Sequence, residues 1–126
     1  METCKLVLPE HLNHSGYPFG GQLLKWVDEA ACIAARLDYP QCEFVTVAMD
    51  RLNFMERSHL GAILRFEVPC LKVGITSVDY ATTVTNALAN FDEERLIFSL
   101  DVTFVHIGAG GTKQPLPSCL DPLDCC

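Results

Sequence analysis

Residues 22–38 read Gln-Leu-Leu-Lys-Trp-Val-Asp-Glu-Ala-Ala-Cys-Ile-Ala-Ala-Arg-Leu-Asp, and this run determines the architecture. Apolar side chains recur in it at steps of three and four residues, and Trp26 and Ile33 widen the apolar stripe beyond half of the helical wheel. The spacing predicts one α-helix, about 25 Å long at about 1.5 Å per residue. Pro40 prevents its continuation. A helix this apolar is expected to be buried by a sheet that wraps around it.

The stretches on either side of this helix have the composition of β-strands. Short turns between consecutive strands favour antiparallel pairing, and one helix covers only one face of such a sheet. The alternation slips around Asp50-Arg51, which predicts a bulge, and Pro69 cannot donate to a ladder, which predicts an edge or a bulge there. The predicted fold class is α+β, with one long central helix and a curved antiparallel sheet of about five strands. The expected strands cover residues 3–8, 44–55, 61–72, 76–88 and 95–107.

Length and composition limit the possible classes of protein. With 126 residues, the chain forms one compact domain, which we assign to residues 1–108, followed by a flexible tail rich in Gly, Pro and Cys at 109–126. The net charge of −7 argues against a nucleic-acid partner. No apolar run reaches membrane-spanning length, and the first residues lack the layout of a signal peptide. We therefore expect a cytoplasmic protein with no membrane partner.

The cysteines and histidines do not predict a metal site. The chain has seven cysteines, an odd number, without a Cys-x-x-Cys pair, and its four histidines fall at no spacing typical of a zinc site. Cys32 and Cys70 are interpreted as small apolar residues.

Two features near the helix start are candidates for chemistry. The loop at residues 11–21 ends in Phe19-Gly20-Gly21, where first-turn amides without intrahelical partners can bind an anion or a carbonyl oxygen. Asp28 lies at the edge of the apolar arc, beside small residues, and is a candidate general base. Two simpler interpretations stay open: the glycines permit a tight turn, and Asp28 points to water at the rim.

The segment from Pro9 to Ala31 resembles the signature of hotdog-fold acyl-CoA thioesterases, specifically the bacterial acyl-CoA hydrolase branch. The pattern is Asn-x-x-Gly-x-x-Phe-Gly-Gly, beginning at Asn13, with an Asp seven residues after the second glycine, which is Asp28. The resemblance covers about residues 5–107. After Phe54 the family usually has an Arg-Pro pair, whereas this chain has Met55-Glu56-Arg57. Further matches are Val45-Thr46, Asp50, Phe54, Gly61 and residues 73–77.

This resemblance implies an activity, an assembly and a set of roles. It implies a hotdog fold, a dimer whose sheets join edge to edge and often assembles into hexamers, and hydrolysis of an acyl-CoA to CoA and a free acid without a metal or bound cofactor. Asp28 would be the base or the nucleophile, Asn13 would position the water or the carbonyl, and Gly20 and Gly21 would stabilise the oxyanion. Asn and Asp of one site would come from opposite subunits. For coenzyme A, the implied contacts are Arg57, Lys72, Gly74, Ile75, Thr76 and Ser77.

Two other functions are known to use the same fold. A hotdog hydratase needs a His about one turn after the helix Asp, and residues 29–37 contain none. A non-catalytic acyl-CoA-binding or regulatory hotdog module remains the alternative, because the same pocket could bind CoA without cleaving it. For Arg57 and Lys72 the simpler interpretation is solubilising surface charge.

Overall fold

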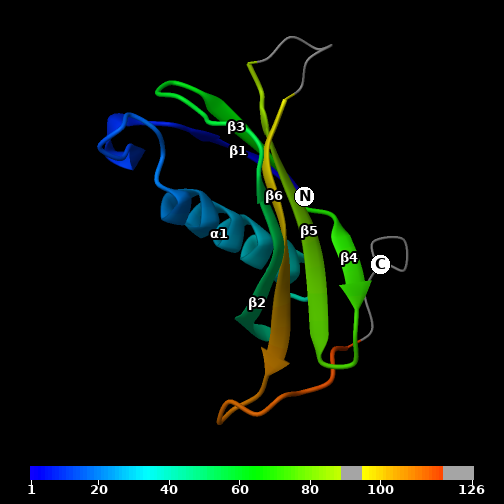
Figure 1. The fold of residues 1–126 in the computed structure, drawn as a ribbon. Helices are drawn as coiled ribbons and strands as arrows, with labels where there is room; N and C mark the ends of the chain where they lie inside the picture. The colour runs from blue at the N-terminus through cyan, green and yellow to red at the C-terminus, as the bar shows by residue number, and fades with distance from the viewer. Residues whose placement is uncertain (89–94, 118–126) are drawn as a thin grey trace.

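The predicted helix is α1, Gly20–Asp38, in the computed structural model, which describes residues 1–88 and 95–117 (Figure 1). It begins two residues before the predicted start, because the Phe19 carbonyl already accepts the amides of Gln22 at 3.0 Å and Leu23 at 3.1 Å. It ends before Pro40, as predicted. The buried side chains of α1 are Leu23, Trp26, Val27, Ala30, Ala31, Ala34 and Ala35.

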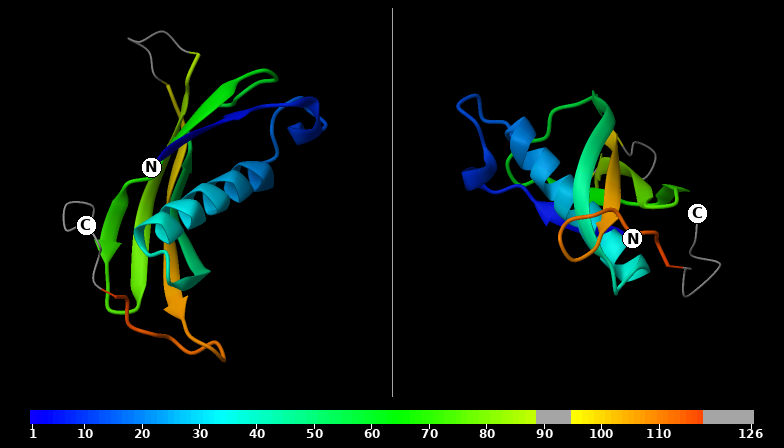
Figure 2. Two further views of the ribbon diagram at one scale, coloured as in Figure 1. Left: turned by 180° about the vertical axis from the view of Figure 1, so that it is seen from behind. Right: turned by 90° about the horizontal axis from the view of Figure 1, so that it is seen from below.

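In the described part of the chain, six strands form one antiparallel sheet around α1. The order across the sheet is β1-β3-β5-β6-β2, and β4 pairs with β5. The helix lies on one face of this curved sheet, as the two views of Figure 2 show. A short 3-10 helix, η1 (Pro9–His11), follows the first strand. The strands are β1 (Glu2–Leu6), β2 (Glu43–Phe54), β3 (Ile63–Glu67), β4 (Cys70–Val73), β5 (Ser77–Asn86) and β6 (Leu96–Ile107).

The fold class is confirmed, and the strand count differs from the prediction at Pro69. The expected strand at residues 61–72 is divided into β3 and β4, and both pair with β5. Pro69 has no amide hydrogen to donate, but its carbonyl accepts the Ala81 amide at 3.1 Å. The chain between β3 and β4 therefore stays hydrogen-bonded to β5. The predicted irregularity at Asp50-Arg51 is also confirmed, because the register of β2 against β6 shifts between Asp50 and Asn53 and Arg51 has a φ of 55°.

A buried hydrogen bond joins the end of the helix to the sheet. Tyr80 on β5 is 1% exposed, and its hydroxyl donates to Oδ2 of Asp38, the last residue of α1, at 2.7 Å. Burial, and secondarily the Asp38 carboxylate, raises the pKa of Tyr80 far above that of a free tyrosine.

Tyr80→Phe is expected to lower the free energy of unfolding at pH 7 by roughly 1–2 kcal/mol, because the hydrogen bond is lost. The unfolded chain releases the Tyr80 proton near pH 10.0, whereas the folded chain retains it. Wild-type stability should therefore fall as the pH rises above 10, and this contribution should vanish in the Phe variant. Urea unfolding at pH 7, 9, 10 and 11 measures both effects. The contributions of Tyr17 and Tyr39 to the pH dependence cancel in the comparison, because both proteins contain these residues. If the free energy of unfolding falls with pH equally steeply in the two proteins, Tyr80 is not the source of the pH dependence.

The chain after β6 returns to the sheet. The Gln114 amide donates to the His106 carbonyl at 2.9 Å, and the Leu116 amide donates to the Ile75 carbonyl at 2.8 Å. Leu116 also packs against the core. Thus the first part of the predicted tail is tied to the sheet at these points, while residues 118–126 of that prediction lie outside the described residues. The domain boundary at 108 stays a prediction.

Among residues 1–88 and 95–117, no helix has both the length and the hydropathy needed to cross a membrane.

Candidate functional site

Asn13 organises the loop that leads into α1. Its Oδ1 accepts the backbone amides of Ser15 at 2.9 Å and Tyr17 at 3.2 Å, and its own amide donates to the Tyr17 carbonyl at 2.6 Å. Two N–H donors on one side-chain oxygen fix which end of the Asn13 amide is the carbonyl. The Nδ2 group has no hydrogen-bond partner among the described residues, so it is available as a donor.

The helix start presents two further donors. Gly20 and Gly21 open α1, and in the described chain no acceptor is found for their amides, as is usual for the first turn of a helix. A Cβ at Gly20 would meet only Phe54 Cζ at 3.8 Å, and one at Gly21 would meet no described atom within 4 Å. The described packing therefore leaves room beside both residues. The amides also carry the positive end of the helix dipole, which favours a negatively charged oxygen.

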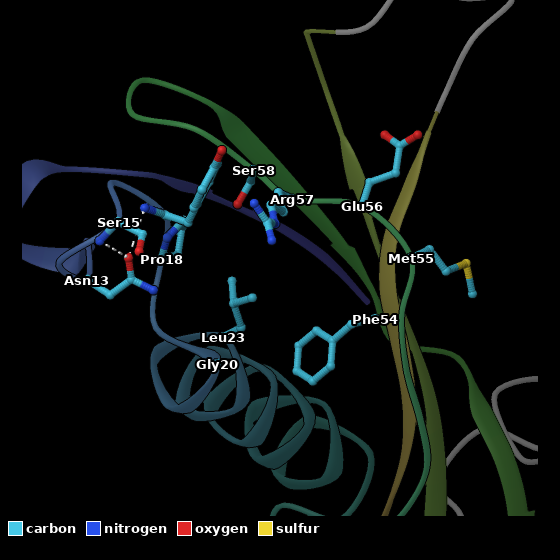
Figure 3. Close-up of a pocket in the computed structure, with 11 residues that line it drawn as sticks. Asn13, Ser15, Pro18, Gly20, Leu23, Phe54, Met55, Glu56, Arg57 and Ser58 are labelled. Carbon is cyan, nitrogen blue, oxygen red and sulfur yellow. Dashed lines mark hydrogen bonds between the residues drawn. The ribbon is translucent and has the colours of Figure 1, made fainter.

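A pocket of about 510 Å³ lies between this loop and the chain that follows β2. In Figure 3 the Phe54 ring points towards the helix, and Arg57 and Ser58 point towards the loop. Met55 and Glu56 also line the pocket. The pocket is lined by donors and apolar groups together, among them Asn13, Tyr17, Gly20, Phe54, Arg57 and Ser58. Three of the predicted site residues, Asn13, Gly20 and Arg57, are thus brought to one pocket.

Arg57 closes the pocket against the loop. Its guanidinium carbon lies 4.7 Å from the centre of the Tyr17 ring, a cation–π contact, and the centre of the His59 ring lies 5.5 Å from that of Tyr17. Glu56, the adjacent acid, lies 3.6 Å from the Arg95 guanidinium instead.

Asp28 lies elsewhere in the protomer. It is eight residues after Gly20, or about 12 Å along the helix axis. It is half-buried, and its Oδ1 accepts the Thr46 hydroxyl from β2 at 2.7 Å. Asp28 is absent from the lining of the pocket. Within one protomer, the predicted carboxylate and the predicted oxyanion donors are therefore separate.

The other residues predicted to contact coenzyme A lie at the opposite end of the sheet. Phe54 pairs with Phe98, and Phe98 pairs with Val84 on β5. Ser77 begins β5 seven residues before Val84, a separation of about 23 Å at about 3.3 Å per residue. Lys72 on β4 and the turn formed by Gly74, Ile75, Thr76 and Ser77 share that distant end.

The turn has a structural reason for its glycine. The Gly74 amide donates to the Ser77 carbonyl at 2.7 Å, and a Cβ at Gly74 would lie 2.7 Å from Ser77 Oγ. Ile75, at the tip, is 81% exposed. Gly74 is therefore needed for the close approach to Ser77, whether or not a ligand binds there.

Residue-by-residue reasoning missed two groups. Thr46, the hydrogen-bond donor to Asp28, appeared only as a match to the family pattern. Ser58 and its buried position had no signal at all, because a serine in a turn normally faces solvent. The described residues contain no group of three or more His, Cys, Asp or Glu side chains that could hold a metal ion.

Comparison with known proteins assigns the chain to a family. The profile of the Thioesterase superfamily matches residues 15–87. An uncharacterized acyl-CoA thioester hydrolase of Buchnera aphidicola is 30% identical over 111 residues, which cover 87% of this chain and 82% of that protein. Acyl-coenzyme A thioesterase 11 of Mus musculus is 31% identical over 86 residues, 68% of this chain. This match spans only 14% of the mouse protein.

Solved structures have the same architecture. A hexameric hotdog fold thioesterase of Campylobacter jejuni is 29% identical with a TM-score of 0.78, over 91% of this chain and 88% of that chain. A mutant of a hexameric broad specificity acyl-coenzyme A thioesterase is 25% identical with a TM-score of 0.81, over 91% of this chain and 84% of that chain. From the matched profile and these structures, the chain belongs to the Thioesterase superfamily and has the hotdog fold.

Proposed function

We propose that this protein hydrolyses the thioester of an acyl-CoA to coenzyme A and a carboxylic acid. The observation that carries the proposal is the pocket at the helix start, where the Asn13 Nδ2 group and the unpaired amide of Gly20 meet apolar walls. Donors of this kind stabilise the oxyanion that forms when a thioester carbonyl is attacked. The relatives with acyl-CoA thioesterase or hydrolase in their names support the same substrate class.

In the proposed reaction the helix residues have separate roles. The Asp28 carboxylate removes a proton from water, and the resulting hydroxide adds to the thioester carbon. The carbonyl oxygen becomes negative and is held by the Gly20 and Gly21 amides, with Asn13 Nδ2 as a third donor. The carbonyl then re-forms from the oxyanion and the C–S bond breaks. Coenzyme A leaves as the thiolate and takes up the proton that Asp28 had removed from water, which restores the carboxylate. Direct attack by Asp28 on the thioester carbon is the alternative role for the same carboxylate.

A dimer would bring Asp28 to the pocket. β2 is an edge strand, and its exposed apolar side chains include Val45, Val47 and Phe54. An unpaired apolar edge is suited to pairing with a second copy. If two β2 strands pair antiparallel about an axis near Met49 and Asp50, the Phe54 end of one lies beside the Val45 end of the other. Asp28 contacts Thr46, next to Val45, so the partner's Asp28 would approach this pocket.

The same symmetry would bring the predicted coenzyme A turn to the pocket. Ser77 pairs with Val105, and Val105 pairs with Val45, so the turn at 74–77 lies on the same row of the sheet as Val45. The same pairing of subunits would therefore bring both Asp28 and the turn at 74–77, which are remote from the pocket within one protomer, to the pocket of the partner. We propose that Lys72 and the turn of the partner bind coenzyme A. Three such dimers would make a hexamer, the assembly named for the solved thioesterases.

The proposed chemistry uses only water, the substrate and the side chains and backbone amides of this chain. The absence of a resident cofactor and the cytoplasmic location stay predictions.

Hydrolysis is tested by incubating the protein with acetyl-, butyryl-, octanoyl- and palmitoyl-CoA. Loss of thioester absorbance is the preferred measurement, because the seven cysteines of the chain interfere with thiol reagents. At least one substrate is expected to give a kcat/KM of about 10⁴ M⁻¹ s⁻¹ or more. Calorimetric binding of coenzyme A without cleavage of any ester would contradict hydrolysis and support the non-catalytic module.

A further inference from the structure

The Ser58 hydroxyl is buried at the wall of the pocket. The residue is 3% exposed, and its Oγ has no hydrogen-bond partner among the described residues. Thr82 and Thr85 also have unpaired buried hydroxyls, but neither lines this pocket. Because an unmade buried hydrogen bond costs free energy, a hydroxyl directed into a cavity indicates that a ligand oxygen completes it.

The backbone on both sides of Ser58 is anchored. Before it, the amides of Met55 and Glu56 share the carbonyl of Ile97 at 2.9 and 3.2 Å. After it, the Gly61 amide donates to the Val7 carbonyl at 2.9 Å. The segment therefore holds the Ser58 side chain at the pocket wall, as a preorganised binding group requires.

Arg57 places a positive charge at the same end of the pocket. Its guanidinium stacks on the Tyr17 ring, which leaves the N–H groups at its edge available as donors. In the described part of the chain no carboxylate lies within ion-pair distance of Arg57; the adjacent Glu56 also lines the pocket, but its carboxylate lies 3.6 Å from the Arg95 guanidinium. A hydroxyl and an uncompensated guanidinium side by side match a carboxylate.

Apolar walls connect this polar end to the donors at the helix start. Pro18, Leu23 and Phe54 line the pocket between the Gly20 amide and Ser58. If the thioester carbonyl lies at Gly20, as in the proposed function on which this inference rests, the acyl chain follows these walls. We propose that Ser58 and Arg57 bind a carboxylate at the far end of the acyl group. The preferred substrates are then monothioesters of short dicarboxylic acids.

The test compares two acyl groups of the same length. Succinyl-CoA ends in a carboxylate where butyryl-CoA ends in a methyl group, so the ratio of their kcat/KM values reports recognition of that end. The wild type is expected to prefer succinyl-CoA. Ser58→Ala should lower the ratio roughly 10- to 100-fold, because a hydrogen bond to a charged group is lost. Ser58→Thr keeps the hydroxyl and should largely retain the preference.

Thr82→Val is the matched control, since it removes another buried, unpaired hydroxyl outside the pocket and should leave the ratio unchanged. A ratio that Ser58→Ala does not change overturns the inference but leaves hydrolysis intact. A wild type that cleaves no acyl-CoA instead refutes the proposed function, and the inference with it.

A phosphate of coenzyme A is the other anionic group that could reach Arg57 and Ser58. Product inhibition by coenzyme A and by 3′-dephospho-coenzyme A separates the two sources. Equal effects of Ser58→Ala on both inhibitors, together with the loss of succinyl preference, support the acyl assignment. If Ser58→Ala weakens inhibition by coenzyme A but not by 3′-dephospho-coenzyme A, Arg57 and Ser58 bind the 3′-phosphate, and the acyl assignment is overturned.

Discussion

Asp28→Asn is expected to reduce kcat for acyl-CoA hydrolysis by roughly 10²- to 10⁴-fold, the range that general-base catalysis contributes. The substitution removes the negative charge, so the side chain can neither accept a proton from water nor attack the thioester. It retains an oxygen that can accept the Thr46 hydroxyl, which donates to Asp28 Oδ1 at 2.7 Å. The variant should therefore remain folded. Steady-state kinetics and thermal unfolding together measure the two properties.

Thr46→Val is the control for this substitution. It removes the hydroxyl donor but leaves the carboxylate in place, so a smaller loss of kcat is expected than in Asp28→Asn. If Asp28→Asn turns over substrate at the wild-type rate, Asp28 has no part in the chemistry. The pocket at the helix start would then need another base.

Mixing two inactive variants is expected to restore activity, if each site uses residues of both subunits. Asn13→Asp keeps an oxygen for the Ser15 and Tyr17 amides but removes the Nδ2 donor. A mixed dimer of Asn13→Asp and Asp28→Asn has one intact site and one doubly altered site. Random assembly from equal amounts should therefore reach about a quarter of wild-type activity.

The restored activity must come from mixed oligomers. Each variant refolded alone is the control and should stay at its own low activity. If Asn13 and Asp28 of one protomer act together, no mixture contains an intact site and no activity returns. That outcome would contradict the two-subunit arrangement without affecting the family assignment.

The fold could be predicted largely from local pattern. The spacing of apolar residues in 22–38 defines a helix whatever surrounds it, because a period near 3.6 residues is a property of the chain alone. The breakers at Pro40, Pro69 and Asp50-Arg51 also act locally, by removing an amide donor or disturbing alternation. What local pattern did not decide was whether Pro69 bends one strand or divides it. That depended on the Ala81 amide of β5, which lies opposite Pro69 only after the sheet forms.

The candidate site could be predicted from local sequence pattern only in part. The motif from Asn13 to Gly21 could be identified in the chain because its loop is built from short-range hydrogen bonds, such as those of the Asn13 side chain. Arg57 joined this loop through a contact with Tyr17 across 40 positions of sequence (57 − 17), which no spacing rule predicts.

The sequence by itself determined the helix, the succession of helix and strands along the chain and the donors that open the helix, because each follows from a few consecutive residues. Only the tertiary structure decided that Asp28 lies away from the pocket and that Ser58 is buried within it. The first depends on how β2 lies beside the helix, with Thr46 at Asp28 and the end of the strand at the pocket. The second depends on anchoring by Val7 and Ile97, which are distant in sequence. Burial is a property of packing between remote segments, so it cannot be read from a turn residue alone.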